Sequence, residues 1–317
     1  MTEKANLNRR QALTLGAAAA AAGVAGAPAA QAKKVDLDFK SPTWNRDAMA
    51  KLQGNLDPEK EKVGWYGGKV LGVRPGEKVQ ELFRFEGFSM ARLLPQEDGS
   101  YRKVLREVGF YRDIKTNEIM SEYENPYTGE TVRVVPIAND PFNYTISEFF
   151  PQPPSYGGLN PEEVPRIPYI LPWSEKADKV LLTTDIHLYY PAALQPDKWP
   201  RESPGPMVRV SEMFRYVIDR ADLMNPDLTS IEYHGVWNRV TPWLPWMLMD
   251  QAPGHCLYVC DMGAWDSMDV VPEEILEATR GQLGEKFLSA PTEDYGPSLS
   301  SLERYALEQE PAPPKAE

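Results

Sequence analysis

Two of the three histidines in the sequence stand two positions after a carboxylate. His187 follows Asp185 in the segment TTDIHLYY, and His234 follows Glu232 in IEYHGVW. Side chains two positions apart lie on the same face of a β-strand. If the two faces meet inside a barrel, these four residues form a site for general acid–base catalysis. The alternative is that each histidine is a separate side chain, solvated or hydrogen-bonded.

The segment WNRVTPWLPWMLM, from Trp237 to Met249, has the composition of a pocket wall. The residues in it that are expected to bind a ligand are Trp237, Asn238, Arg239, Trp243 and Trp246. Arginine can bind a carboxylate or a phosphate in bidentate fashion, so Arg239 is expected to hold a substrate anion. The apolar run that starts at Trp243 is far shorter than the ~20 residues that span a bilayer. Tryptophan and methionine also fill cores, so a core plug is the alternative to a pocket wall.

Arginines recur along the central part of the chain. They are Arg84, Arg106, Arg112, Arg133, Arg215 and Arg239. Arg106 is expected to be a further ligand-binding residue, because an arginine on a strand can clamp an anion. The alternative is an ordinary cross-strand pair with a glutamate such as Glu86, Glu107 or Glu122.

Metal and cofactor motifs are not recognisable. The sequence has no H-x-H or H-E-x-x-H spacing, so no metal site is predicted, and it identifies no cofactor. On one strand, Cys256 and Cys260 would lie about 13 Å apart, which is beyond disulfide reach. They are therefore expected to be buried thiols. Serine-hydrolase, nucleotide and dinucleotide chemistry lack their usual sequence support, since no G-x-S-x-G, Walker or Rossmann motif is present.

The elements that would position these residues are extended segments joined by short turns. The expected strands are VQELFRFEGFSMARLL, YRKVLREVGFYR, EIMSEY, ETVRVVPI, FNYTISEFF, KVLLTTDIHLYY, MVRVSEMFRYVID, TSIEYHGVWNRV and CLYVCDM. Short turns imply antiparallel neighbours, and closure of the sheet removes its exposed edges. The fold is therefore predicted to be mainly β, an antiparallel meander that closes into a lipocalin-like barrel with a few short helices. A β-sandwich is the alternative.

Four segments do not belong to this meander. Residues 47–52 predict a short helix, which the glycines of GWYGG at residues 64–68 separate from the first expected strand. Seven prolines within residues 151–173 predict a long loop across one end of the sheet. Residues 272–287 predict a helix packed against the sheet. The tail at residues 303–317 is expected to be disordered.

The N-terminal residues have the features of an export signal. Arg9 and Arg10 precede an alanine-rich stretch that is too short to anchor a helix in a bilayer. Ala30-Gln31-Ala32 is a small-residue cleavage motif. Residues 1–32 are therefore expected to be a twin-arginine signal that engages the twin-arginine export machinery, with an uncleaved anchor as the alternative. Residues 33–302 are expected to form a single β-barrel domain, periplasmic or secreted.

The net charge of the chain argues against nucleic acid and anionic lipid as partners. The whole chain carries a net charge of −12, and removal of the basic export segment leaves the rest more acidic still. An acidic chain repels nucleic acid and anionic lipid. The expected partner is therefore a small apolar or aromatic molecule, with no nucleic acid and no stable membrane span.

Two long stretches resemble a known family. They are GFSMARLLPQEDGSYRKVLREVGFYRDIKTNEIMSEYENPYTGETVRVVPIANDP and NRVTPWLPWMLMDQAPGHCLYVC. In their order, within about residues 45–290, the chain resembles a domain-of-unknown-function family numbered 1838, which occurs in exported bacterial proteins and in fungi. The resemblance implies a single β-rich domain similar to the lipocalin-like barrels. It implies no particular activity.

These observations support two classes of function. The first is an isomerase, cyclase or lyase that acts on a small apolar or aromatic molecule by acid–base catalysis, with His234 as acid or base and Glu232 or Asp185 sharing the proton. The second is a periplasmic protein that binds such a molecule without reacting with it. A structural role is a third alternative. Because the first two both require a pocket, the prediction is an exported small-molecule-binding protein that could also be an enzyme.

Overall fold

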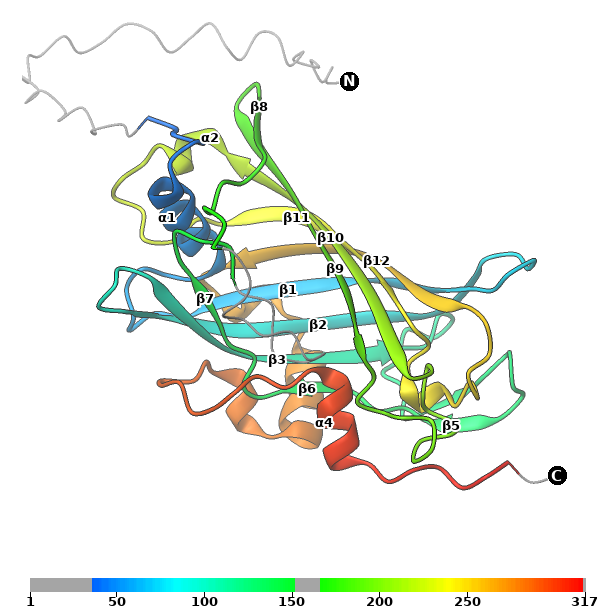
Figure 1. The fold of residues 1–317 in the computed structure, drawn as a ribbon. Coiled ribbons are helices and arrows are strands. Elements are labelled where there is room, and N and C mark those ends of the chain that lie inside the picture. Colours follow the sequence, from blue (N-terminus) through cyan, green and yellow to red (C-terminus); the bar gives the residue numbers. More distant parts are fainter. Residues whose placement is uncertain (1–35, 152–165, 316–317) are drawn as a thin grey trace, which may run out of the picture. The chain divides into compact units, whose positions relative to one another are not determined.

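The computed structural model describes residues 36–151 and 166–315. The predicted export signal and most of the predicted proline-rich loop lie outside the described residues. Residues Lys34–Glu317 form one compact unit, which is built on a large curled β-sheet (Figure 1). Within the described ranges, no helix is long and apolar enough to cross a membrane.

A 10-stranded antiparallel sheet is the centre of this unit. In pairing order its strands are β6 (Ile137–Asn139), β3 (Tyr101–Arg112), β2 (Gln80–Pro95), β1 (Lys62–Val73), β12 (His255–Trp265), β11 (Tyr233–Thr241), β10 (Met207–Asp219), β9 (Lys179–Pro191) and β8 (Trp173–Lys176), and β7 (Tyr144–Ile146) also pairs with β3. A separate hairpin joins β4 (Glu122–Glu124) to β5 (Thr131–Arg133). The prediction of a mainly β, antiparallel fold is confirmed.

The sheet curls without closing by strand pairing. Across the described residues, its edge strands β6 and β7 do not pair with β8 at the other edge, so the predicted closed barrel is not confirmed. Figure 1 shows β9 and β10 crossing the direction of β1, β2 and β3. The long strands all belong to this one sheet, which also argues against a β-sandwich. The concave face of the curled sheet forms the interior of the molecule, where side chains from β2, β7, β9, β10, β11 and β12 share one core cluster.

Strand β1 lies where the sequence predicted a break. The run GWYGG falls inside this strand, between β2 and β12. Close packing explains Gly68, because a Cβ atom there would lie 2.2 Å from the carbonyl oxygen of Val259 in β12. Gly68 therefore allows β12 to approach β1, and β1 links the N-terminal strands to the C-terminal ones.

One end of the concave face is closed by helix α1 (Pro42–Gln53). The helix begins after Ser41, whose hydroxyl accepts the backbone N–H of Trp44 and so caps the first turn. Its buried Met49 and Leu52 belong to the same cluster as interior side chains of β9 to β12. The predicted helix at residues 47–52 is thus present and extends further toward the N-terminus.

The opposite end is closed by the tryptophan-rich segment, residues 237–249. After β11 the chain turns into the short 3-10 helix η2 (Pro245–Met247). Trp246 and Met247 pack there with Tyr123 and Val132 of the β4–β5 hairpin. The side-chain amide of Asn125 in that hairpin donates to the carbonyl oxygen of Met247 at 2.7 Å.

The convex face of β1, β2 and β3 is covered by short helices. They are η3 (Met268–Val270), α3 (Glu273–Ala278), the π-helical turn η4 (Thr279–Leu283) and η5 (Glu285–Leu288). Ile275 and Phe287 pack there against Phe88 and Phe110 of the sheet. The single helix predicted over residues 272–287 is broken at Gly284, whose φ of +105° is not helical.

The C-terminal segment is more ordered than the sequence suggested. Residues 303–308, expected to be disordered, lie in helix α4 (Ser301–Glu308). A capping box between Ser300 and Glu303 fixes its first turn. The ring of Tyr305 lies edge-on to Trp199, with centroids 5.8 Å apart. A further short helix, α2 (Arg220–Leu223), follows β10 directly.

Candidate active site

The first predicted pair, Asp185 and His187, lies on the solvent-exposed convex face of β9. The two side chains are in contact as expected, with His187 Nε2 2.8 Å from Asp185 Oδ2. The Nδ1 atom of the same ring lies 3.0 Å from the hydroxyl of Ser211. However, 61% of the His187 side chain and 59% of the Asp185 side chain are exposed, so the pair lines no enclosed site.

The second predicted pair, Glu232 and His234, does not meet the first. Both residues are exposed, and His234 packs edge-on against Trp265 with ring centroids 5.3 Å apart. Ser211 pairs with His187 on one side and with Val240 on the other, and Val240 is six positions beyond His234 on β11. At about 3.3 Å per residue, the histidines are therefore separated by about 20 Å along the strands. The structure does not bring the four residues together.

The alternation along β11 explains this outcome. Tyr233 is buried in the core cluster, and Trp237 packs against it from the same face. Asn238 pairs with the half-exposed Val259 and therefore shares the convex face of β11 with His234. Trp237 and Arg239 were thus predicted on the correct side for an interior site, whereas Asn238 and His234 were not.

Arg106 joins the covering helices to the sheet. Its Nε lies 2.9 Å from Asp140, and one of its terminal nitrogens donates to the carbonyl oxygens of Lys286 and Ser289 at 3.0 Å. These contacts hold η5 against β3. Arg106 is therefore a structural residue on the convex side, away from the interior.

Trp243 and Trp246 are both core residues and part of the pocket lining. Only 7% of Trp243 and 3% of Trp246 are exposed, and the indole of Trp243 donates to the carbonyl oxygen of Ala252 at 2.9 Å. Even so, residues 241–244 line two separate cavities. The tryptophan-rich segment is a plug for one end of the sheet, and its two sides form the walls of neighbouring pockets.

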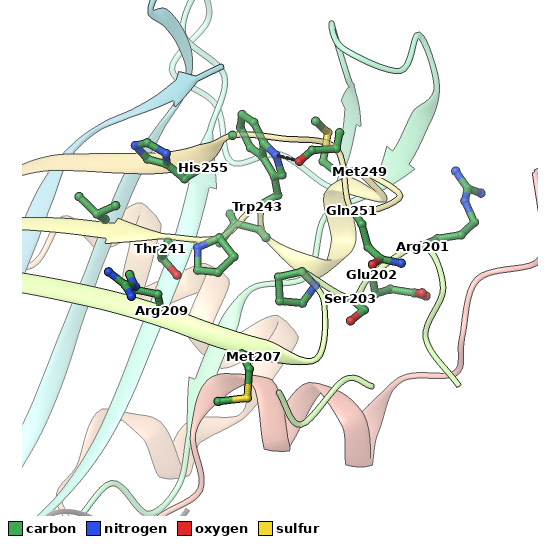
Figure 2. A pocket seen from close by; sticks show the side chains of 16 residues that line it. Arg201, Glu202, Ser203, Met207, Arg209, Thr241, Trp243, Met249, Gln251 and His255 are labelled. Atoms are coloured by element: carbon green, nitrogen blue, oxygen red, sulfur yellow. Dashed lines mark hydrogen bonds between the residues drawn. The ribbon is translucent and has the colours of Figure 1, made fainter. Parts of the chain in front are cut away.

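The first cavity, which we call the end pocket, has a volume of about 260 Å³. Its lining includes Arg201, Ser203, Thr241, Trp243, Gln251 and His255 (Figure 2). Arg201 is already paired with Glu130 at 2.8 Å and with Asp250 at 3.1 Å. Figure 2 shows Arg201 and Arg209 on opposite sides of the pocket. Its charged groups therefore do not converge on one ligand atom.

The second cavity, which we call the inner pocket, opens from the interior toward α4. It is smaller, with a volume of about 110 Å³. Its lining includes Tyr111, Asn139, Tyr190, Arg239, Tyr258 and Tyr305. Strands β3, β6, β9, β11 and β12 and helix α4 thus all contribute, and α4 covers the gap between the two edges of the sheet.

Arg239 is the charged residue of the inner pocket lining that faces the interior from β11. One of its terminal nitrogens lies 3.2 Å from Glu212 on the neighbouring strand β10, and 32% of its side chain is exposed. Its Nε is enclosed and has no hydrogen-bond partner in the described part of the chain. Burial lowers the pKa of Arg239 and is the largest single effect, but Glu212, Tyr258, Tyr190 and Glu107 together exceed it, so the pKa is raised. The guanidinium therefore stays charged with donors to spare.

Glu107 on β3 is a second interior carboxylate, partly buried and close to the pocket lining. It accepts a hydrogen bond of 2.8 Å from the side-chain amide of Asn139, which lines the pocket. Burial raises the pKa of Glu107 and the charge of Glu212 raises it further, against the opposing effects of Asn139, Tyr66 and Arg239. The net effect is a carboxyl group that holds its proton to higher pH than usual.

Aromatic rings surround these charges. Tyr258 packs against Phe85 with centroids 5.3 Å apart and against Trp237 at 5.5 Å. Trp246 packs against Tyr111 at 5.1 Å. Such walls favour an aromatic or apolar ligand and strengthen electrostatic contacts by excluding water.

Lys103 lies on the same face of β3 as Glu107, nearer to α1. Its amine donates to the side-chain oxygen of Gln53 at 2.9 Å and to the hydroxyl of Tyr144 at 3.1 Å. Burial, with a smaller effect of Lys62, lowers the pKa of Lys103 to about 7. The Lys103 amine therefore has neutral hydrogen-bond partners and a pKa close to neutral pH.

The predicted buried thiols are confirmed. Cys256 and Cys260 are buried and unbridged on β12. Burial raises the pKa of both thiols to about 12, so they remain protonated and unreactive at neutral pH. Across residues 36–151 and 166–315, no group of three or more His, Cys, Asp or Glu side chains could hold a metal ion.

Glu107 and Glu212 were not among the predicted site residues. Charged residues on both faces of VLREVGFYR were visible, and Glu107 is one of them. The available signal was the phase of the strand, since Lys103, Glu107 and the buried Tyr111 share one face. Assigning that face to the interior requires knowing that the covering helices lie on the other side.

Comparison with known proteins identifies the family but no activity. No curated protein matches the chain. The family model described as "Protein of unknown function (DUF1838)" matches residues 59–306. This range contains strands β1 to β12 and the helices that cover the convex face. The chain therefore belongs to the family of proteins of unknown function DUF1838.

Proposed function

We propose that this chain binds a small aromatic or apolar molecule carrying an anionic group, with the anion on Arg239 and the apolar part in the inner pocket. The observation that carries the proposal is that Arg239 has hydrogen-bond donors without partners. A guanidinium facing the interior has one ion pair, an unpartnered Nε and an exposed portion at the pocket. A carboxylate matches the planar donor fork of arginine.

The walls of the pocket support the apolar part of the ligand. Tyr111, Trp246 and Tyr258 form one aromatic group around Arg239. Pockets for small ligands commonly combine apolar walls with a few polar anchors. The export signal predicted at residues 1–32 would place this binding in the periplasm or outside the cell.

Native mass spectrometry of protein purified from its own host tests the proposal. We expect the wild-type chain to carry an aromatic or apolar acid. The Arg239→Met variant should lose it, because a hydrogen bond to a charged group contributes about 1.5–3 kcal/mol, or about 10-fold to 100-fold in affinity.

Arg215→Met is the matched control, since Arg215 is an exposed arginine of β10. The ligand should remain bound in this variant. A wild-type protein that is consistently empty, or a ligand retained equally in the Arg239 variant, would contradict the proposal.

A further inference from the structure

Ser211 on β10 extends the exposed pair of Asp185 and His187 into a row of three groups. His187 Nε2 lies 2.8 Å from Asp185 Oδ2, and Nδ1 of the same ring lies 3.0 Å from the Ser211 hydroxyl. One ring nitrogen therefore has a carboxylate as its partner and the other has a hydroxyl. A carboxylate, an imidazole and a serine hydroxyl in this order are the groups of nucleophilic acyl transfer.

Strand pairing fixes this row. Ser211 is the direct partner of His187 across β9 and β10, and Asp185 stands two positions before His187 on the same face of β9. Directly paired residues of antiparallel strands have Cβ atoms about 4.5–5.5 Å apart, which a hydrogen bond from imidazole to hydroxyl can span. The three groups therefore belong to paired strands of the sheet and not to loops.

The carboxylate determines which tautomer of His187 faces the serine. Asp185 accepts a hydrogen bond, so it favours the ring that carries its proton on Nε2. Nδ1 then has a free lone pair and can accept the proton of the Ser211 hydroxyl. This is the protonation state in which an imidazole activates a serine. Asp185 acts through His187 and is therefore a positioning residue.

The end pocket begins next to Ser211. Arg209, two positions before Ser211 on the same face of β10, forms part of the pocket wall (Figure 2). Val240, the direct partner of Ser211 on β11, lines the same pocket. Further apolar residues of the lining include Met207, Trp243, Leu244 and Met249. The volume of about 260 Å³ exceeds the roughly 150 Å³ void that holds a benzene ring. The pocket therefore has room for a small apolar acyl group whose carbonyl carbon lies at Ser211.

We infer that Ser211 is a nucleophile and His187 its general base, and that they hydrolyse an ester with a small apolar acyl group. The acyl group occupies the end pocket, and the alcohol part lies over the exposed face of β9. The guanidinium of Arg209, which lies over the ring of Tyr189 at 5.3 Å, is the cation nearest to Ser211 along β10. It stabilises the negative charge that develops on the carbonyl oxygen. This activity is separate from ligand binding in the inner pocket.

The reaction consumes water and releases a carboxylic acid and an alcohol. The Ser211 proton passes to Nδ1 of His187 while Oγ bonds to the carbonyl carbon and the carbonyl π electrons move to oxygen. When these electrons return, the bond to the alcohol oxygen breaks, and that oxygen takes the proton from Nδ1. Water then gives a proton to Nδ1 and bonds to the acyl carbon, and the Ser211 oxygen leaves with that proton.

Labelling of the full chain with a fluorophosphonate, which modifies activated serines, tests the nucleophile. We expect mass spectrometry to locate the label on Ser211. In His187→Gln the labelling rate should fall by about 100-fold or more, because the general base is lost. Ser174→Ala is the control, since Ser174 is an exposed serine of the neighbouring strand β8, and its labelling rate should equal that of the wild type.

Hydrolysis of 4-nitrophenyl butyrate and 4-nitrophenyl acetate tests the acyl pocket. We expect a higher kcat/KM for the butyrate, and Ser211→Ala should lose the hydrolysis of both esters. Asp185→Asn should lower kcat at an unchanged KM, and Asp185→Glu should recover part of the loss. No label on Ser211, equal labelling in His187→Gln, or hydrolysis that Ser211→Ala leaves unchanged overturns the inference. Equal kcat/KM for the two esters overturns the assignment of the acyl group to the end pocket.

Discussion

At the scale of single residues, the interior contains charged side chains, which a purely apolar core would not. Glu107, Glu212 and Arg239 face one another across the concave side, so one carboxylate remains without a cationic partner. Burying charge is costly unless the charge is paired or wet. Partial exposure of Arg239 and Glu212 reduces that cost, and it also leaves the groups accessible to a ligand.

Lys103 makes a testable contribution to the pH dependence of stability. Its folded-state pKa is about 7, below the ordinary value of 10.5. Between these pH values the unfolded chain holds the proton and the folded chain does not, so the free energy of unfolding should rise with pH. In Lys103→Met this rise should be smaller by about 2 kcal/mol between pH 7 and 9.

Urea denaturation at several pH values, kept below the titration of tyrosine, measures the difference. Lys78→Met is the control, because Lys78 is exposed in the loop between β1 and β2. It should keep the pH slope of the wild type. Equal slopes in Lys103→Met and wild type would show that Lys103 is not a neutral amine in the folded chain near pH 9.

The residues of the candidate site were predictable only in part. Trp237 and Arg239 followed from composition, because an arginine next to tryptophans suits an anionic aromatic ligand. His234 was chosen because histidine is the usual proton carrier, but the strand phase that directs Trp237 inward directs His234 outward. Glu107 was visible only as a pairing partner. Period-two alternation separates the faces but does not tell which one is covered.

At the scale of elements, α4 forms one side of the inner pocket. The helix lies across the lining formed by β6, β9 and β11, and none of its residues is fully buried. The cavity beneath it, about 110 Å³, is smaller than the roughly 150 Å³ void that holds a benzene ring. Binding of an aromatic acid as proposed would therefore require α4 to move outward.

Loosening α4 should speed ligand entry. Tyr305 fixes the helix against Trp199, so Tyr305→Ala should increase the association rate of 2-naphthoate, followed by stopped-flow fluorescence. Leu307→Ala is the control from the same helix, since 73% of Leu307 is exposed, and it should leave the rate unchanged. Equal rates in all three proteins would show that the ligand enters by another route.

The elements themselves were largely predictable. Alternating segments bounded by turn residues located the long strands, and YRKVLREVGFYR coincides with β3. Strand β1 was missed because glycine breaks regular structure in most contexts, whereas at Gly68 it permits a close approach to β12. Helix α4 was missed because its Pro-rich surroundings favour disorder. The capping box of Ser300 and Glu303 stabilises a helix here only when the helix packs on a surface.

At the scale of the whole molecule, the sheet edges are covered by other segments. An isolated bridge joins Phe149 to Pro168 near one end, and α4 contacts β6 farther along the same gap. Covering an edge protects it from pairing with other chains as closure does. From the sequence we expected the edges to be protected by closure of the sheet. The segments that cover them instead were not predicted, because they have no strand pattern.

The export signal predicted at residues 1–32 has a testable consequence for the whole molecule. Residues Lys34–Glu317 form a compact unit by themselves, and the first described helix begins at Pro42. Removal of residues 1–32 therefore takes away no contact within that unit. We expect the shortened chain to have the same thermal unfolding midpoint as the full chain and to remain in the cytoplasm. Replacing Arg9 and Arg10 by lysine should likewise block export, as cell fractionation would show, without unfolding the protein. A lower midpoint would mean that the segment stabilises the fold, and undiminished export of the double variant would rule out the twin-arginine route.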